Sequence, residues 1–288
     1  MRYSKEWIDY QLLDMADGEK LEKWGDYILI RPDPQIVWKD KTNPKLWKQA
    51  HARYVRSNTG GGHWEKLRAM DDSWAIKYKD LTFNLKPMGF KHTGLFPEQS
   101  VNWDYMIGKI SKETKKREIK VLNLFAYTGG ATVACAYAGA TVVHVDSSQG
   151  MVNWAKENIN SSNLGDRTVR FLVDDVIKFV KREIRRGNKY DAIIMDPPSY
   201  GRGKNGEVWT LEKNIYELIE LCSELISDNP LFMIINTYTG GFSGTVIKNA
   251  LNHAINKEKI ITFDEIGLRQ KNSEEFLPCG MTTICEFK

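Results

Sequence analysis

The chain has 288 residues, of which 42% are hydrophobic and 27% are charged, values that are ordinary for a globular protein with a substantial core. No apolar run approaches the ~20 residues of a membrane helix, and the first residues lack the apolar stretch of a signal peptide, so we expect no membrane association and a cytoplasmic location. The formal net charge of +4 tolerates a polyanionic partner without requiring one.

Residues 1–95 predict a small β-rich domain, and residues 96–118 a helix followed by a linker. Short strand-like runs flank turns at Gly25-Asp26 and Lys79-Asp80. The polar stretch 39–63, which ends in consecutive glycines, indicates a loop. A proline at the start of PEQSVNWDYMIGKI favours a helix there, because proline is well accommodated in a first helical turn.

From residue 119 to residue 288, strand-like apolar runs alternate with segments of helical character. This alternation predicts a parallel sheet covered on both faces. Right-handed crossovers then give an α/β, Rossmann-like, doubly wound domain. The two closing runs, ITFDEIGLR and TTICEFK, predict a C-terminal antiparallel hairpin at the edge of the sheet. The five earlier strands bring the total to seven and are IKVLNLFAY, TVVHVDSS, VRFLVDD, DAIIMDPPSY and PLFMIINTY.

Glycine and aspartate residues follow the first three of these strands. In a doubly wound sheet, ligands bind beyond the carboxyl ends of the strands. Gly129 lets the backbone approach a ligand, and the helix after it offers free N–H groups and a positive dipole end to a carboxylate. Asp146 ends the second strand, where its carboxylate can accept both hydroxyls of a ribose. Asp174 and Asp175 end the third strand, where an acceptor beside a backbone N–H can bind the edge of adenine.

The sequence lacks the motifs of two other classes of nucleotide-binding protein. A dinucleotide dehydrogenase usually carries G-x-G-x-x-G after the first strand, whereas this loop reads G-G-A-T-V-A. The chain also has no GxxxxGK[ST] phosphate-binding loop. A ligand that contains ribose and adenine but no phosphates therefore fits the pattern better.

The segments LNLFAYTGGATVACAYAGATVVHVDSS, VRFLVDDV and DAIIMDPPSY resemble the motifs of class I S-adenosylmethionine-dependent methyltransferases. More narrowly, they are similar to the group that methylates large-subunit ribosomal RNA at cytosine C5 or guanine N7. The resemblance covers about residues 80–288, because KHTGLFPEQ is also similar to a T-G-x-F segment of that group. It implies S-adenosyl-L-methionine as the cofactor and ribosomal RNA as the partner.

The resemblance also implies roles for individual residues. Phe125, Tyr127, Thr128 and Gly129 would line the methionine end of the cofactor, and Asp146 would hold its ribose. Asp175 with Val176 would contact the adenine, with Asp174 as an alternative to Asp175. The complete set implied for the cofactor is Phe125, Ala126, Tyr127, Thr128, Gly129, Asp146, Ser147, Asp174, Asp175, Val176 and Asp196.

The end of the fourth strand reads Asp196-Pro197-Pro198-Ser199-Tyr200 and is the candidate catalytic segment. Each proline restrains the residue before it, which predicts a stiff, extended loop that fixes the Asp196 carboxylate. That carboxylate can accept a hydrogen bond from an amine or a ring N–H, and Tyr200 can stack on a planar base. The plainer alternative is a rigid turn without chemistry. We assign the catalytic role to Asp196, Pro197, Pro198 and Tyr200.

Two departures from related motifs bear on the target atom. Amino-methylating enzymes usually carry an aromatic residue directly after the second proline, where this chain has Ser199. The cytosine-C5 members of the resembled group carry a nucleophilic cysteine after the fifth strand, where this chain has Tyr238. None of its four cysteines lies at either motif, and they show no metal-ligand spacing, so we expect reduced thiols and no bound metal. A target with its own lone pair, such as a base nitrogen, is favoured.

Several functional alternatives remain open at this stage. Glycine and basic residues in GRGKNG, 201–206, favour a flap that orders on a phosphate backbone, or else an ordinary loop. The main hypothesis is an RNA base methyltransferase. The others are a methyltransferase acting on a protein or small molecule, and a non-catalytic nucleoside-binding protein. The sequence predicts neither the oligomeric state nor whether the N-terminal domain binds RNA.

Overall fold

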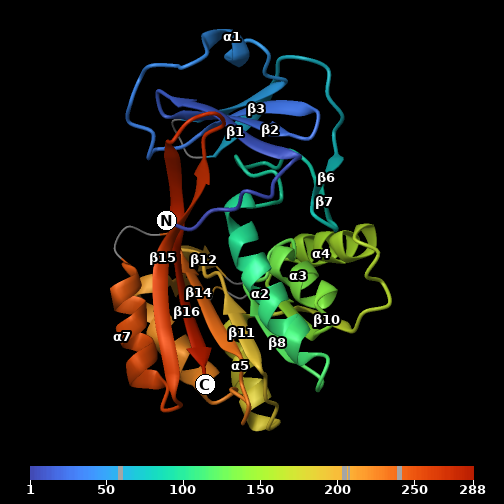
Figure 1. The fold of residues 1–288 in the computed structure, drawn as a ribbon, viewed down its shortest axis with the longest axis vertical. Helices are drawn as coiled ribbons and strands as arrows, with labels where there is room; N and C mark the ends of the chain where they lie inside the picture. Colours follow the sequence, from blue (N-terminus) through green and yellow to red (C-terminus); the bar gives the residue numbers. More distant parts are fainter. Residues whose placement is uncertain (58–60, 203–205, 207, 239–241) are drawn as a thin grey trace. The chain divides into compact units, whose positions relative to one another are not determined.

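A computed structural model describes residues 1–57, 61–202, 206, 208–238 and 242–288. The chain divides into two compact units, each made of two segments (Figure 1). Unit 1 combines Met1–Ser100 with Gly267–Cys279, and unit 2 combines Val101–Ile266 with Gly280–Lys288. Within the described residues, no helix has both the length and the apolar character that a membrane crossing requires.

Unit 2 is built on a seven-stranded sheet with the order β10-β9-β8-β11-β14-β16-β15. The strands from β10 to β14 pair in parallel, and β16 pairs antiparallel with β14. The expectation of a Rossmann-like sheet closed by two C-terminal strands is therefore confirmed. In chain order the strands are β8 (Lys120–Leu124), β9 (Thr141–Asp146), β10 (Val169–Val173), β11 (Ala192–Met195), β14 (Phe232–Thr237), β15 (Lys259–Arg269) and β16 (Phe276–Phe287).

Helices cover both faces of this sheet, as a doubly wound fold requires (Figure 1). On one face, Phe179, Leu218 and Leu251 pack into a single apolar core with strand residues such as Leu122 and Val145. These three side chains come from α5 (Val176–Arg185), α6 (Leu211–Ser223) and α7 (Gly244–Ala254). The other face carries α2 (Ser100–Glu113), α3 (Gly130–Tyr137) and α4 (Gln149–Ser161).

The face under α2 and α3 contains buried polar contacts. Successive strand residues point to opposite faces, so Asn123 faces away from the apolar core that holds Leu122. The Asn123 amide donates to the Thr132 hydroxyl of α3 at 2.9 Å. The Asn102 amide of α2 donates to Asn236 of β14 at 3.2 Å. These hydrogen bonds satisfy polar groups that would be costly to bury alone.

Unit 1 contains a five-stranded sheet with the order β1-β2-β3-β4-β5 and a separate β6-β7 pair. Trp24 and Tyr27 pair across Gly25-Asp26, which confirms the predicted turn; Gly25 has a φ of +65° there. The elements are β1 (Tyr10–Ala16), β2 (Glu19–Trp24), β3 (Tyr27–Pro32), α1 (Pro44–Trp47), β4 (Ala52–Arg56), β5 (Gly62–Lys66), β6 (Trp74–Tyr78), β7 (Leu81–Leu85) and a 3-10 turn, η1 (Pro97–Gln99).

A buried ion pair crosses the β2-β3 pair of unit 1. The Arg31 guanidinium donates to both carboxylate oxygens of Glu22, at 2.6 and 2.8 Å. The Tyr10 hydroxyl donates to the same carboxylate at 2.8 Å. Burial favours the protonated acid, but Arg31 and Lys20 outweigh burial and hold the pKa of Glu22 at about 2. This network fixes the Tyr10 ring at one side of the sheet.

Two features of unit 1 differ from the sequence expectation. Residues 39–63 are not one loop, because they include α1, β4 and the start of β5; residues 58–60 lie outside the described part. Residues 267–279 belong to unit 1 and not to a continuous 119–288 domain, because Lys271 donates its backbone N–H to Leu12 at 2.7 Å. Both differences depend on pairing between distant strands, which local periodicity does not encode.

Candidate functional site

The ends of four parallel strands meet at one edge of the unit 2 sheet. Leu124 of β8 pairs with Val145 of β9 on one side and with Met195 of β11 on the other. Val173 of β10 pairs with Asp146. The loops that leave these positions therefore start side by side. Every residue that the sequence proposed for the cofactor and for catalysis lies in these loops or directly at their ends. Asp146 ends β9, Val176 begins α5, and Tyr200 begins the short strand β12 (Tyr200–Arg202).

The loop between β8 and α3 has a tightly turned backbone. Phe125, Tyr127 and Gly129 have φ values of +54°, +50° and +83°, in the left-handed region. Gly129 donates its N–H to Ala126 at 2.9 Å, and Ala126 donates to Val145 at 3.0 Å. The loop is thus anchored to the end of β9.

Close packing against α4 explains the glycine at position 129. A Cβ atom there would lie 2.9 Å from the Cβ of Ala155, inside van der Waals contact. The amide of Asn158, also on α4, donates to the Thr128 carbonyl at 2.8 Å. The sequence pattern pointed to neither Ala155 nor Asn158, because both lie within an ordinary amphipathic helix.

Asp146 joins the first two loops through its carboxylate. One oxygen accepts the Tyr127 backbone N–H at 2.9 Å, and the other accepts the Ser148 backbone N–H at 2.8 Å. Burial raises the pKa of Asp146, and the two hydrogen bonds oppose that rise. Each carboxylate oxygen has about two acceptor positions, so each keeps capacity for one more donor. Ser147, which follows Asp146, is exposed.

The two aspartates after β10 have different partners. Asp175 is the N-cap of α5, and its side chain accepts the Lys178 backbone N–H at 2.9 Å. Asp174 forms an ion pair with Arg182 and also accepts the Asp175 backbone N–H at 2.9 Å. Val176, the first residue of α5, is buried. Asp175 therefore has a structural role in the helix, whereas Asp174 has a partly exposed carboxylate.

The loop after β11 passes from buried to exposed. Asp196 is half-buried, Pro197 is buried, and Pro198 and Tyr200 are exposed. The indole N–H of Trp209 donates to the Pro198 carbonyl at 2.7 Å. The expected flap at 201–206 is described only in part, since residues 203–205 lie outside the described part of the chain. Its first two residues are paired, because Gly201 and Arg202 of β12 lie antiparallel to β13 (Val208–Thr210).

Aromatic packing connects the two loops at the sheet edge. The rings of Phe125 and Trp209 have centroids 5.0 Å apart at an angle of 55°. Trp209 thus contacts the β8-α3 loop through its ring and the Pro198 carbonyl through its N–H. Trp209 was not among the predicted site residues, because its place beside Phe125 depends on the β12-β13 pairing.

His144 lies within β9, behind the β8-α3 loop. It is buried, and its Nδ1 shares a 2.9 Å hydrogen bond with the Thr132 hydroxyl. Its Nε2 has no hydrogen-bond partner among the described residues. Burial lowers the pKa of His144 to about 3, so the ring is neutral at physiological pH. The ring is thus a core residue, with a hydrogen-bond partner for only one of its two nitrogens among the described residues.

All four cysteines are described, and none forms a disulfide. Cys135 lies in α3, Cys222 in α6 and Cys285 in β16, and these three are buried; Cys279 is half-buried in unit 1. Burial raises the pKa of each thiol. Tyr238 follows β14 at the position where a nucleophilic cysteine was considered, while residues 239–241 lie outside the described part.

Curated relatives are similar to large parts of this chain. A Shewanella frigidimarina protein named ribosomal RNA large subunit methyltransferase K/L is 31% identical over 247 residues, which is 78% of this chain. The protein of the same name from Shewanella woodyi is 35% identical over 224 residues, or 70% of this chain. The chain spans only about a third of the length of these relatives, 34% and 30% respectively.

Solved structures extend the similarity to almost the whole chain. A SAM-dependent methyltransferase from Agrobacterium tumefaciens has a TM-score of 0.93 and is 32% identical, covering 99% of this chain and 93% of its own. A second structure, complexed with SAH, covers 98% of this chain and 76% of its own with a TM-score of 0.75; at 21% identity it supports the fold alone.

The family model described as S-adenosylmethionine-dependent methyltransferase matches residues 49–256. This span is well over half of the chain and includes the loops after β8, β9, β10 and β11. The chain therefore belongs to the S-adenosylmethionine-dependent methyltransferase family, and S-adenosylmethionine is its methyl donor.

Proposed function

We propose that this enzyme methylates a nitrogen atom of a base in ribosomal RNA. The class of substrate is supported by the names of the curated relatives, which span the same loops at 31% and 35% identity. The nitrogen target is supported by the thiols of this chain, as argued below. We also propose that the cofactor binds at the edge of the unit 2 sheet where these loops meet.

Asp146 fits the ribose of the cofactor. Its carboxylate is held by two backbone N–H groups, and each oxygen keeps acceptor capacity for a hydroxyl. Gly129 is the N-cap of α3, and we assign the cofactor carboxylate to the N-terminus of this eight-residue helix, where free backbone N–H groups and the positive end of the helix dipole favour an anion. Phe125, Ala126, Tyr127 and Thr128 complete the lining at the methionine end, and Ser147 flanks the ribose.

Asp174 is the better candidate for the adenine amine. The side chain of Asp175 caps α5, and moving it would leave a helix N–H without its partner. The Asp174 carboxylate is instead held by a partly exposed ion pair, which costs little to rearrange. We assign the adenine edge to the Asp174 carboxylate with the backbone near Val176. This choice takes the alternative that the sequence left open.

The Asp196 loop is placed for the acceptor base. The cofactor supplies an electrophilic methyl group, and the chain must align the acceptor in line with it and exclude water. Trp209 and two prolines stiffen the loop, so Asp196 can accept a hydrogen bond from an amine or ring N–H of the base. The ring of Tyr200 is 53% exposed and offers a stacking face.

The burial and the raised pKa values of the cysteine thiols are the observation that supports a nitrogen atom as the target. Methylation at cytosine C5 requires a thiolate that adds to the base. Reactive thiolates have lowered pKa values and some exposure. Here three thiols are buried within unit 2, the fourth is in unit 1, and every pKa is raised. A nitrogen lone pair attacks a methyl group without such help.

Transfer of a radioactive methyl group tests this function. Purified protein is incubated with labelled S-adenosylmethionine and unmodified ribosomal RNA, beside Asp196→Ala and a matched Asp166→Ala variant; the Asp166 carboxylate is 79% exposed. We expect nuclease-sensitive label with the wild type and Asp166→Ala, and loss of label with Asp196→Ala. Nucleoside analysis should find an N-methylated base. Label in protein or small molecules, or 5-methylcytosine as the product, would contradict the proposal.

A further inference from the structure

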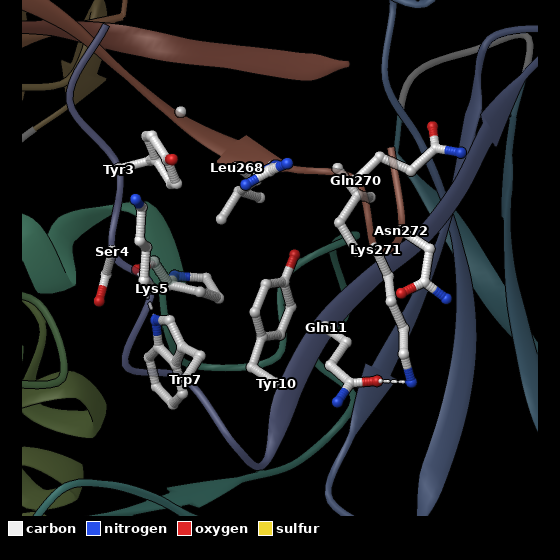
Figure 2. Close-up of a pocket in the computed structure, with 14 residues that line it drawn as sticks. Tyr3, Ser4, Lys5, Trp7, Tyr10, Gln11, Leu268, Gln270, Lys271 and Asn272 are labelled. Atoms are coloured by element: carbon white, nitrogen blue, oxygen red, sulfur yellow. Dashed lines mark hydrogen bonds between the residues drawn. The ribbon is translucent and has the colours of Figure 1, made fainter. Parts of the chain in front are cut away.

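A pocket of about 430 Å³ lies wholly within unit 1. Its lining comes from the first residues of the chain, the start of β1, Pro97 of η1, and residues 267–272 at the end of β15 (Figure 2). We call it the N-terminal pocket. Its volume falls within the range of small-ligand sites, about 300–1,000 Å³.

The lining of the N-terminal pocket is basic. It includes Lys5, Arg269 and Lys271, and its described residues contain no aspartate or glutamate. Arg269 is paired with Glu274 outside the lining. Lys271 donates to the neutral Gln11 side chain at 2.8 Å, and the Lys5 ammonium lies over one face of the Tyr3 ring, 5.7 Å from its centroid. Among the described residues, these two lysines have no carboxylate partner, so their charge is available to an anion.

The same pocket contains three aromatic rings, each anchored outside it. The Trp7 indole N–H donates to the Ser100 hydroxyl at 2.9 Å, and its ring packs edge-on against Tyr10 with a 5.8 Å centroid separation. Tyr10 is fixed by Glu22. Tyr3 is half-buried and packs edge-on against Phe276, at 4.9 Å. Figure 2 shows the Tyr3, Trp7 and Tyr10 rings gathered in the pocket, with Lys5 and Lys271 on either side of Tyr10.

Preordered rings beside these two lysines match the two chemical parts of a nucleotide. Flat rings bind bases of any sequence by stacking, and lysines bind the backbone phosphates. An apolar ligand would leave the lysines unused, and a simple anion would leave the rings unused. We propose that the N-terminal pocket binds one unpaired nucleotide of RNA, with its base against Tyr3 or Trp7 and its phosphates beside Lys5 and Lys271. The choice of RNA over another nucleotide source rests on the proposed function.

Binding of a short RNA to the full chain tests the pocket directly. The probe is a fluorescein-labelled, single-stranded ten-nucleotide RNA, followed by fluorescence anisotropy without cofactor. A Lys5→Gln/Lys271→Gln variant is compared with Lys39→Gln/Lys45→Gln, whose exposed lysines lie outside the lining. We expect at least a tenfold loss of affinity for the first variant only. Its salt dependence should fall by about 1.4 in log–log slope, since each single-strand phosphate contact contributes about 0.7.

A second comparison tests the rings. An abasic RNA of equal length should bind the wild type more weakly than the normal RNA, and Tyr3→Leu should reduce that difference while circular dichroism stays unchanged. Equal binding by both lysine variants, or no preference for bases, would overturn the proposal. Displacement of the RNA by AMP at an equal concentration would assign the pocket to a free nucleotide instead, and so would also overturn it.

The outcome of this test is separable from that of the proposed function. Asp146→Ala should lose methyl transfer but keep RNA binding, because Asp146 is assigned to the cofactor ribose and does not line the N-terminal pocket. If the wild type methylates ribosomal RNA while the lysine variants bind alike, only the pocket proposal fails. If the pocket variants lose RNA binding but no RNA is methylated, only the proposed function fails.

Discussion

The backbone N–H of Tyr127 donates to the carboxylate of Asp146 at 2.9 Å, which ties the loop after β8 to the end of β9. Asp146 therefore has two tasks: it shapes the loop, and in the proposed site it holds the ribose. Removing it should affect cofactor binding more than a typical surface substitution does. The raised pKa of Asp146 also implies that affinity weakens on acidification at a higher pH than for an ordinary aspartate.

We expect Asp146→Ala to weaken binding of S-adenosylmethionine by about 100-fold or more, since hydrogen bonds to a charged group contribute about 1.5–3 kcal/mol each. Isothermal titration calorimetry gives the affinity directly. The matched variant Asp166→Ala removes an exposed carboxylate and should titrate like the wild type. Equal affinities for the two variants would show that Asp146 does not touch the cofactor.

Gly129→Ala should destabilise unit 2 by more than its backbone strain alone. Alanine in the left-handed region costs about 1–2 kcal/mol, and its Cβ would also meet Ala155 at 2.9 Å. Gly187 has a φ of +70°, and a Cβ added there would meet no atom within 4 Å, so Gly187→Ala carries the strain without the contact. Urea unfolding of both variants separates these effects. If both variants lost the same free energy of unfolding, α4 would have to shift to make room for the Cβ at no additional cost.

Asp174 and Asp175 should respond to substitution in opposite ways. Asp175→Ala removes the cap of α5 and should lower the free energy of unfolding by about 0.5–2 kcal/mol, with a smaller effect on cofactor affinity. Asp174→Asn loses only a partly exposed ion pair and should change stability by less than about 1 kcal/mol. Its cofactor affinity should fall about tenfold. Denaturation measures the stability of both variants, and calorimetry measures their cofactor affinity. A larger loss of affinity for Asp175→Ala than for Asp174→Asn would assign the adenine to Asp175 instead.

Tyr200→Ala should raise the KM for RNA or lower kcat by about 10- to 100-fold, because stacking on a base contributes about 1–3 kcal/mol. Tyr200→Phe keeps the ring and loses only the 2.6 Å hydrogen bond from Arg202, so it should remain close to the wild type. Tyr216→Ala, at another exposed tyrosine of unit 2, serves as the control. Methyl transfer at varied RNA concentrations gives KM and kcat for the three variants. If Tyr200→Ala were as active as Tyr216→Ala, Tyr200 would not stack on the base.

His144 should make unit 2 less stable in acid. The unfolded chain protonates this ring below about pH 6.5, whereas the folded ring stays neutral down to about 3. The unfolded state thus binds more protons between these values, and stability falls as the pH is lowered through this window, by about 1.4 kcal/mol per pH unit at most. His144→Asn should lose this part of the slope. Unfolding at pH 7.5 and pH 5 measures it; identical slopes would contradict the buried neutral ring.

The sequence was most informative where function depends on residues at strand ends. Alternating strands and helices predicted the sheet of unit 2, and the registers bring Leu124, Val145, Val173 and Met195 together at one edge as expected. The residues after them were therefore correctly placed near one another. Their contacts with cofactor and substrate stay predictions.

Other features could not be found by reading along the chain. Trp209 reaches Phe125 only because β12 and β13 pair, and Glu22 meets Arg31 only across a hairpin register. The strand at 52–56 lies in a polar stretch and is stabilised by pairing with β3 and β5, not by its own periodicity. In each case the partner, and not the local segment, determines the structure.

The composition of unit 1 from two stretches of chain limits how this protein can be cut or recombined. Residues 267–279 pair with β1 through Leu12, so a fragment that stops at residue 100 would lack one wall of the N-terminal pocket. A single crossover between two related genes would combine residues 1–100 of one parent with residues 267–279 of the other. Successful chimaeras should therefore require two exchanges, which carry both segments of unit 1 together.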